Sequence, residues 1–235
     1  MNQSVRIFAM GILAATGMLL GSIAGAASVT KCGSDVCFTY DNSTLFGDAN
    51  VVGNSIFFLP TAFVAESLNG AGAISATDTL NVEVEVMTEG FSLKQFQLLE
   101  NGDYFLSGRG ASVSAGGMFA VTSLTSNCGG IIPCREQQLL DAGPLTTQGS
   151  FQDWSIDSVI NLADNAEWGS DQKVIMTIEN RIAATTLGAG EQAFIQKKFG
   201  AVGVTVVPVP AAAWLLGSAL GGLGLMRRRK TALTA

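Results

Sequence analysis

The stretch TLNVEVEVM, residues 79–87, constrains the fold more than any other part of the chain. Within it, Leu80, Val82, Val84 and Val86 alternate with asparagine and glutamate. A period of two places alternate side chains on opposite faces of a β-strand, whereas a helix would scatter the apolar ones around its circumference. The stretch therefore predicts a strand with one buried face and one solvated face.

Similar apolar segments recur along the chain, separated by clusters of glycine, asparagine, aspartate and serine that form turns. We expect about ten short strands and no amphipathic helix, which predicts one all-β domain, an antiparallel β-sandwich of jelly-roll-like or immunoglobulin-like type. A closed barrel is the alternative. The other strand candidates are 55–63, 111–114, 118–124, 154–162, 173–182, 192–199 and 202–206.

One pair of segments carries a hairpin signal. FSLKQFQLLE, residues 91–100, is followed by Asn101-Gly102-Asp103 and then by YFLSG, residues 104–108. Asn-Gly readily adopts the positive backbone angles of a tight turn. The sequence therefore predicts a β-hairpin that turns at Asn101 and Gly102.

The N-terminus resembles an export signal. Arg6 precedes the apolar run 7–20, and Ala24-Gly25-Ala26 has the small-x-small pattern read by signal peptidase. We expect residues 1–26 to be a signal peptide, cleaved after Ala26. A retained N-terminal membrane anchor is the alternative, but the run is short and interrupted by glycines.

The segment expected to be exported, residues 27–207, is acidic. It holds all 19 acidic residues but only eight of the 13 basic ones, which gives it a net charge of −11. Nucleic acid and anionic membrane surfaces are poor partners for such a surface. Divalent cations or a hydrated polysaccharide are compatible with it.

The four cysteines all lie in this segment. In an oxidising compartment they would form disulfides, and nearness in sequence favours Cys32–Cys37 and Cys128–Cys134. A zinc site is the alternative. It is disfavoured because the spacings are not the usual knuckles and the chain has no histidine.

The absence of histidine also removes the commonest general base and the serine–histidine nucleophile pair. We therefore expect a protein that is not an enzyme. The alternative is a carboxylate-dependent hydrolase. Its best candidates for catalytic residues are Glu83 and Glu85, which would lie about 7 Å apart on one strand face. Alternating glutamates are more typical of a solvated face.

Two groups of aspartates are candidates for a structural calcium, and apart from this ion we expect no cofactor. One group is Asp35, Asp41 and Asp48, and the other is Asp153, Asp157 and Asp164. Neither matches a spaced calcium-binding loop, so Asp153 and Asp157 are weak candidates and turn-forming aspartates are the simpler interpretation.

Tryptophans suggest a sugar contact. Trp154 lies in a strand pattern and is expected in the core, whereas Trp168, in NAEWGSD, is expected on an exposed loop. An exposed indole can stack on a sugar ring, so Trp168 is the candidate for saccharide binding.

Near the C-terminus, residues 211–226 carry no charge and are followed by Arg227, Arg228, Arg229 and Lys230. As a helix this run would be about 24 Å long, slightly less than the ~30 Å thickness of the hydrocarbon core, so a single span is feasible. We expect a transmembrane helix over 211–226, a cytoplasmic basic stop and a cytoplasmic stub, residues 231–235. The body would then lie outside the inner membrane.

The tail VPVPAAAWLLGSALGGLGLMRRRK, residues 207–230, resembles a PEP-CTERM sorting signal, in the variant Val-Pro-x-Pro-Ala-Ala-x-Trp-Leu-x-Gly-Ser. The name-giving motif has glutamate where this chain has Val209, and the variant tolerates an apolar residue there. The matching residues are Val207, Pro208, Pro210, Ala211, Ala212, Trp214, Leu215, Gly217 and Ser218.

The resemblance implies an exosortase substrate of a Gram-negative bacterium, with signal peptidase and an exosortase-type enzyme as processing partners. It implies a body held at the inner membrane on the periplasmic side and then moved to the cell surface or extracellular matrix. Such proteins are associated with exopolysaccharide and biofilm. We therefore expect a structural or adhesive protein; a carbohydrate-binding module, stabilised by calcium, is the alternative.

Overall fold

The computed structural model describes residues 28–162, 168 and 171–208. The expected signal peptide (1–26), transmembrane helix (211–226), basic stop and stub lie outside these residues, as does the sorting signal beyond Pro208. Within the described part of the chain, no helix is long and apolar enough to cross a membrane.

The described residues contain twelve β-strands, and every pairing between these strands is antiparallel. They are β1 (Ser28–Cys32), β2 (Val36–Asp41), β3 (Ala49–Val52), β4 (Ser55–Phe58), β5 (Val64–Leu68), β6 (Gly72–Val86), β7 (Phe91–Ser107), β8 (Ser112–Cys128), β9 (Ile132–Asp141), β10 (Gln152–Asn161), β11 (Lys173–Thr186) and β12 (Gln192–Pro208).

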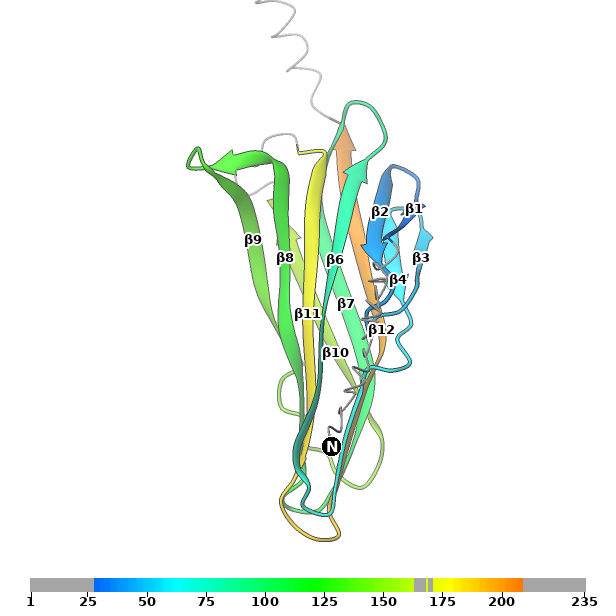
Figure 1. The fold of residues 1–235 in the computed structure, drawn as a ribbon, viewed down its shortest axis with the longest axis vertical. Helices are drawn as coiled ribbons and strands as arrows, with labels where there is room; N and C mark the ends of the chain where they lie inside the picture. The colour runs from blue at the N-terminus through cyan, green and yellow to red at the C-terminus, as the bar shows by residue number, and fades with distance from the viewer. Residues whose placement is uncertain (1–27, 163–167, 169–170, 209–235) are drawn as a thin grey trace, which may run out of the picture.

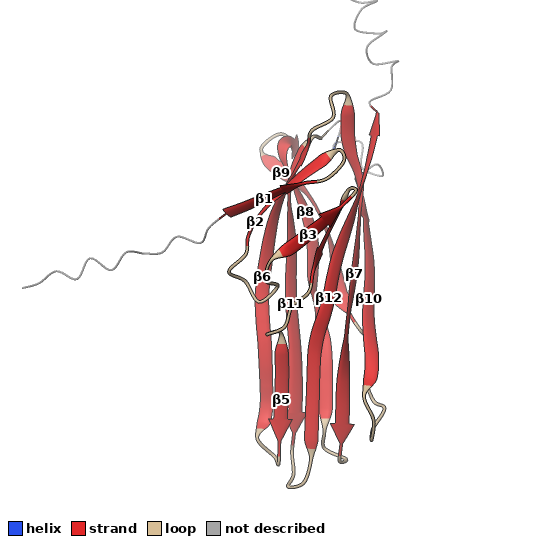
Figure 2. Cartoon of the chain, turned by 90° about the vertical axis from the view of Figure 1, so that its right-hand side faces the viewer, coloured by secondary structure: helices blue, strands red, loops and turns tan. Residues whose placement is uncertain are grey.

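The strands form two sheets that pack face to face. The first sheet has the order β1-β2-β6-β11-β8-β9, and the second has the order β10-β7-β12-β4-β3, with β5 also paired to β12. The long strands run along the long axis of the molecule (Figure 1), and the turned view shows the two layers (Figure 2). The predicted antiparallel sandwich is confirmed. The alternative of a single closed barrel is wrong, because the described strands form two separate sheets.

The period-two pattern that predicted a strand over 79–87 is confirmed by β6. Leu80, Val82 and Val84 are fully buried and face the second sheet, whereas Glu83 and Glu85 are on the outer face. The strand is longer than the pattern indicated, since it begins at Gly72. Five strands have 14 or more residues, so the expectation of short strands is wrong.

The predicted hairpin turn at Asn101 and Gly102 is wrong, because β7 runs straight through both residues. A Cβ atom at Gly102 would lie 1.9 Å from the carbonyl oxygen of Gln196 and 2.8 Å from the indole of Trp154. This glycine therefore lets β12 and the Trp154 side chain approach the strand closely, and it does not form a turn.

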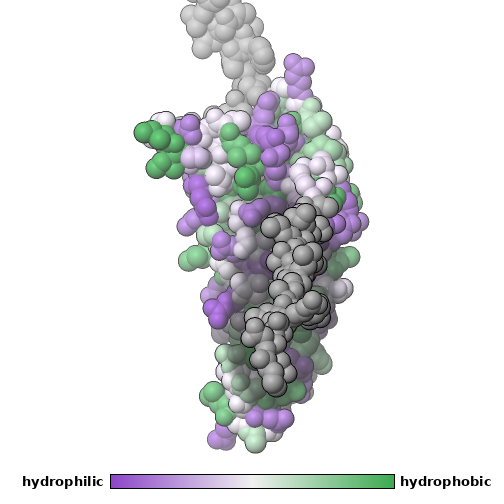
Figure 3. Space-filling view, viewed as in Figure 1, coloured by the Kyte–Doolittle hydropathy of each residue, from purple (hydrophilic) through white to green (hydrophobic). Residues whose placement is uncertain are grey.

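Both predicted disulfides are confirmed, Cys32–Cys37 and Cys128–Cys134. The first links β1 to β2 and the second lies near the tip of the β8–β9 hairpin, so each ties neighbouring strands of the first sheet. That tip carries exposed isoleucines, Ile131 and Ile132, and forms a hydrophobic patch on the surface (Figure 3).

Candidate functional site

Three polar side chains from three strands meet in the interior between the two sheets. Lys197 belongs to β12 and Glu100 to the neighbouring β7, both in the second sheet, whereas Asn180 belongs to β11 in the first. Their exposed fractions are 1%, 0% and 4%. We call Lys197, Glu100 and Asn180 the buried triad.

Strand periodicity places two members of the triad. On β7, Phe96, Leu98, Glu100, Gly102 and Tyr104 occupy alternate positions and all point inward. On β11, Asn180 lies between the inward-facing Ile178 and Ile182 in the same way. The Glu100 carboxylate and the Asn180 amide therefore occupy strand positions whose side chains point into the core.

Alternation also places the third member, because Lys197 continues the buried positions Ala193 and Ile195 of β12. A β-bulge follows it: in the pairing of β12 with β7, Lys197 lies opposite Gly102 and Phe199 opposite Asn101, so Lys198 is an extra residue. The bulge leaves Lys198 exposed and brings Gly200 to the same buried face as Lys197. A Cβ atom at Gly200 would lie 3.3 Å from the Lys197 side chain, so the glycine leaves room for the lysine.

Each member of the triad is hydrogen-bonded to the other two. The Lys197 Nζ atom donates to Glu100 Oε1 at 2.5 Å and also to Asn180 Oδ1, and Asn180 Nδ2 donates to Glu100 Oε2 at 2.9 Å. Because the ammonium only donates and the carboxylate only accepts, these bonds also fix which end of the Asn180 amide faces each partner. The carboxylate therefore touches both the amine and the amide.

Aromatic rings enclose the amine. Lys197 Nζ lies 4.4 Å from the ring centre of Phe46 and 5.9 Å from that of Phe63, and these two buried rings pack edge to face. Burial lowers the pKa of the Lys197 ammonium below its usual value, while the Glu100 carboxylate opposes this shift. The triad thus places a desolvated amine beside an amide and a carboxylate.

Sequence reasoning did not identify the triad, although a signal for it existed. Continuing the alternation of β7 through Asn101-Gly102 assigns Glu100 to the buried face. The same rule, counted from Ala193 and Ile195, assigns Lys197 to the buried face of β12. A lysine, a glutamate and an asparagine at core positions of three strands would have indicated a buried polar site.

The expected pair Glu83 and Glu85 lies on the outer face of β6. Lys173 Nζ contacts both carboxylates, at 2.8 Å and 3.2 Å, and their side chains are 38% and 50% exposed. The two hydrogen bonds raise the pKa of Lys173. Because the pair lies on an open surface, it does not have the desolvated setting that paired catalytic carboxylates need.

The weak calcium candidates Asp153 and Asp157 lie on β10, exposed and four residues apart. Strand geometry separates them by about 13 Å, too far to share one ion. Asp157 contacts Gln97, and Asp164 is outside the described residues. Among the residues that the structure describes, no cluster of three or more acidic or cysteine side chains could hold a metal ion.

Trp168 is not an exposed platform. Its exposed fraction is 2%, so the expectation of an indole stacking on a sugar ring is wrong for this residue. The large apolar ring belongs to the hydrophobic core, where its burial contributes more than a surface position would. Trp154 is buried as expected, and its indole N–H donates to the Gln196 carbonyl at 3.1 Å.

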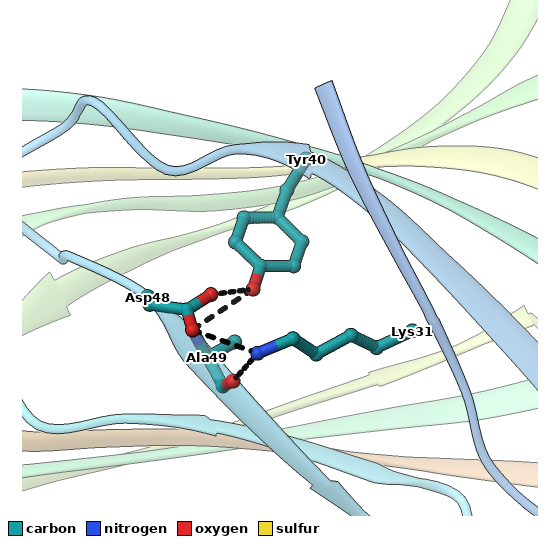
Figure 4. A network of polar contacts seen from close by, with 4 residues as sticks. All are labelled: Lys31, Tyr40, Asp48 and Ala49. Atoms are coloured by element: carbon teal, nitrogen blue, oxygen red, sulfur yellow. Dashed lines mark hydrogen bonds and ion pairs between the residues drawn. The ribbon is translucent and has the colours of Figure 1, made fainter. Parts of the chain in front are cut away.

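Aspartates of the other candidate group are held by local partners. Asp48 accepts hydrogen bonds from Lys31 at 2.8 Å and from Tyr40 at 2.5 Å, and Lys31 also donates to the Ala49 carbonyl (Figure 4). Asp35 accepts from Asn54 and Thr88. The Asp48 contacts attach the edge strands β1 and β3 to each other and to β2. The aspartates of this group therefore have a structural role.

The Asp48 network should make the attachment of β1 sensitive to acid. Hydrogen bonds from Lys31 and Tyr40 lower the pKa of Asp48 below its ordinary value of 3.8. A lowered folded-state pKa stabilises the fold above about pH 4, and this contribution disappears as the pH falls through the lowered value. Thermal unfolding of wild type and Asp48→Asn should differ by at most about 3 °C at pH 7, because exposed pairs contribute little. The difference should shrink as the pH is lowered below 3.8, and a difference that does not change with pH would contradict this role.

Comparisons with known proteins add little to this geometry. No family model matches the chain, and no curated protein matches it. Among solved structures, infectious bursal disease virus of the Gx strain aligns with a TM-score of 0.36 and 13% identity over 66% of this chain and 32% of the viral one. The VP2 subviral particle of that virus gives 0.36 and 13%, over 69% and 34%. This chain thus spans about a third of the viral chains, and TM-scores this low carry no conclusion.

Proposed function

We propose that this chain is an exported structural or adhesive protein of a Gram-negative bacterium, sorted by an exosortase to the cell surface or extracellular matrix. The sandwich would be a jelly-roll-like or immunoglobulin-like scaffold that works beside exopolysaccharide in a biofilm. Anchorage at the inner membrane, with the body in the periplasm, would precede release.

One observation carries this proposal: the last strand of the sandwich ends where the segment that resembles a sorting signal begins. β12 ends at Pro208, the first proline of the Pro-x-Pro pattern. Proline lacks the amide hydrogen that a strand needs and restricts the residue before it, so the chain beyond is disfavoured from continuing the sheet. A processing enzyme would then meet the Pro-x-Pro pattern directly beside a folded body.

Two further features support a scaffold. The long paired strands and the two disulfides are suited to an oxidising exterior, where thiols are not kept reduced. Glu83 and Glu85, the candidates for the hydrolase alternative, are engaged by Lys173 on an open surface. The Ile131–Ile132 tip offers an apolar contact surface.

The test is the C-terminal mass of the protein from cells with and without an exosortase. With the enzyme, we expect surface or matrix protein that ends near Pro210; without it, membrane-bound protein that retains Arg227–Lys230. Changing Pro208 and Pro210 to alanine should also retain the tail, whereas Val209→Ala should be processed normally. Surface-located protein that still carries Arg227–Lys230 would argue for a permanent anchor instead.

A further inference from the structure

We propose that Lys197 and Asn180 become joined by an intramolecular isopeptide bond between Nζ and Cγ, with Glu100 as the residue that transfers protons. The scaffold role proposed above does not require this bond, and nothing in that role accounts for the buried triad. The inference rests on the placement of the three side chains between the sheets.

The nucleophile and the carbon that it would attack are already adjacent. Lys197 Nζ contacts Asn180 Oδ1, and Cγ is bonded directly to that oxygen. Asn180 and Lys197 lie on strands of opposite sheets, so the packing of the two sheets holds the groups together. Such fixed proximity replaces an improbable encounter and can supply a large share of the barrier reduction.

Glu100 is placed to move protons between the two groups. Its Oε1 atom accepts from Lys197 Nζ at 2.5 Å, and its Oε2 atom accepts from Asn180 Nδ2 at 2.9 Å. One carboxylate oxygen thus faces the proton that must leave, and the other faces the nitrogen that must depart. Contact with both reacting nitrogens is the geometric requirement for a general acid–base residue.

The surroundings favour a neutral, nucleophilic amine. Phe46 and Phe63 line the amine, and all three members of the triad are buried. Desolvation disfavours the ammonium form, which is how enzymes activate lysine as a nucleophile. The same dry environment excludes the water that would compete for the Asn180 carbonyl.

The reaction balances without a cofactor or an oxidant. Glu100 takes a proton from the Lys197 ammonium, and the freed Nζ electron pair attacks Cγ of Asn180 to form a tetrahedral intermediate with negative charge on Oδ1. Glu100 then gives that proton to Nδ2, the Cγ=Oδ1 double bond re-forms, and the Cγ–Nδ2 bond breaks to release ammonia. A second proton passes from Nζ to Glu100, which leaves a neutral amide and a carboxylic acid.

The bond would link the two sheets. Cys32–Cys37 and Cys128–Cys134 each join neighbouring strands of the first sheet. A Lys197–Asn180 bond would instead connect β11 of the first sheet to β12 of the second, across a sequence separation of 17 residues. Separation of the sheets would then require a covalent bond to break.

Peptide mapping of the purified full chain tests the proposal. After reduction and denaturation, trypsin and a glutamate-specific protease should cleave after Glu179, Arg181, Glu191 and Lys198. The dipeptide 180–181 and the peptide 192–198 are not adjacent in sequence, so only a cross-link can keep them together. We expect one joined species, lighter than the sum of the two by about 17 Da for the lost ammonia. Separate peptides of unmodified mass, with cleavage after Lys197, would overturn the proposal.

Variants test the role of each group. Glu100→Gln keeps the shape of the side chain but cannot shuttle protons, and we expect its peptides to be separate. The neighbouring Lys198→Arg removes an exposed lysine but keeps the tryptic site after residue 198, and it should leave the cross-link intact. A cross-link that forms in Glu100→Gln would overturn the assignment of Glu100. Because that variant is informative only when folded, its circular dichroism and both disulfides are measured in the same sample.

Discussion

Replacing Lys197 by alanine should lower the free energy of unfolding by about 4 kcal/mol, because it leaves Glu100 buried without the partner that Lys197 supplies, either as an ammonium or in the proposed amide bond. Glu100 is fully buried, and its carboxyl group contacts Lys197 Nζ at 2.5 Å, so in the variant a carboxylate at this position has no group that compensates its charge. The change also opens a space beside Phe46 and Phe63 and abolishes the proposed cross-link. Urea denaturation monitored by tryptophan fluorescence, with the disulfides intact, measures the loss.

The matched control is the adjacent lysine. Lys198 pairs with Asp103 at 2.6 Å, but its side chain is 52% exposed, so Lys198→Ala should change the free energy of unfolding by less than about 1 kcal/mol. Similar losses for the two variants would contradict the energetic importance of the triad. The double replacement Lys197→Met with Glu100→Leu removes both charges, and it should be less destabilising than Lys197→Ala if uncompensated charge is the main cost.

Local sequence patterns predicted a large part of the fold. The alternation in residues 79–87 depends only on which face of a strand is buried, and β6 buries Leu80, Val82 and Val84 as expected. The disulfides depend on nearness in sequence, and both join residues on paired strands of a hairpin. Features set by one segment or by two adjacent strands were therefore accessible without the structure.

Features set by long-range pairing were not accessible in the same way. The buried triad requires the register of β7 with β12 and the packing of β11 against both. Its bulge at Lys198 has no strong sequence signal. Trp168 lies outside the strands, as its polar neighbours predicted, but its expected exposure is wrong, because the size of the indole favours burial regardless of the local polarity.

The Asn101-Gly102 segment shows how two local signals can conflict. Asn-Gly favours a tight turn, but the alternation from Phe96 to Leu106 continues through it without a break. The tertiary structure follows the alternation, because a turn there would remove Glu100 and Tyr104 from the same buried face. A period sustained over several residues outweighs a dipeptide preference when the whole face is buried.

Gly102→Ala is therefore expected to destabilise the protein by about 3 kcal/mol or more, because the new Cβ atom has no room. It would lie 1.9 Å from a backbone oxygen, that of Gln196, and 2.8 Å from the Trp154 ring. Gly203→Ala is the matched control on β12, since its Cβ atom would meet only Ser55 Oγ, at 3.5 Å. That variant should stay within about 1 kcal/mol of wild type. Equal stabilities of the two variants in urea denaturation would contradict the close approach of β12 to β7 at this point.

The same substitution should also disturb the triad, because Gly102 is the register partner of Lys197. If β12 moves away to make room for the Cβ atom, the amine moves with it, while Asn180 stays on β11 in the opposite sheet. A displacement of about 1 Å is enough to reduce the rate of a reaction between held groups by two orders of magnitude. We therefore expect folded Gly102→Ala to give mainly separate peptides 180–181 and 192–198, and Gly203→Ala to give the joined species. A joined species in both variants would show that the bond does not depend on the position of β12 at Gly102.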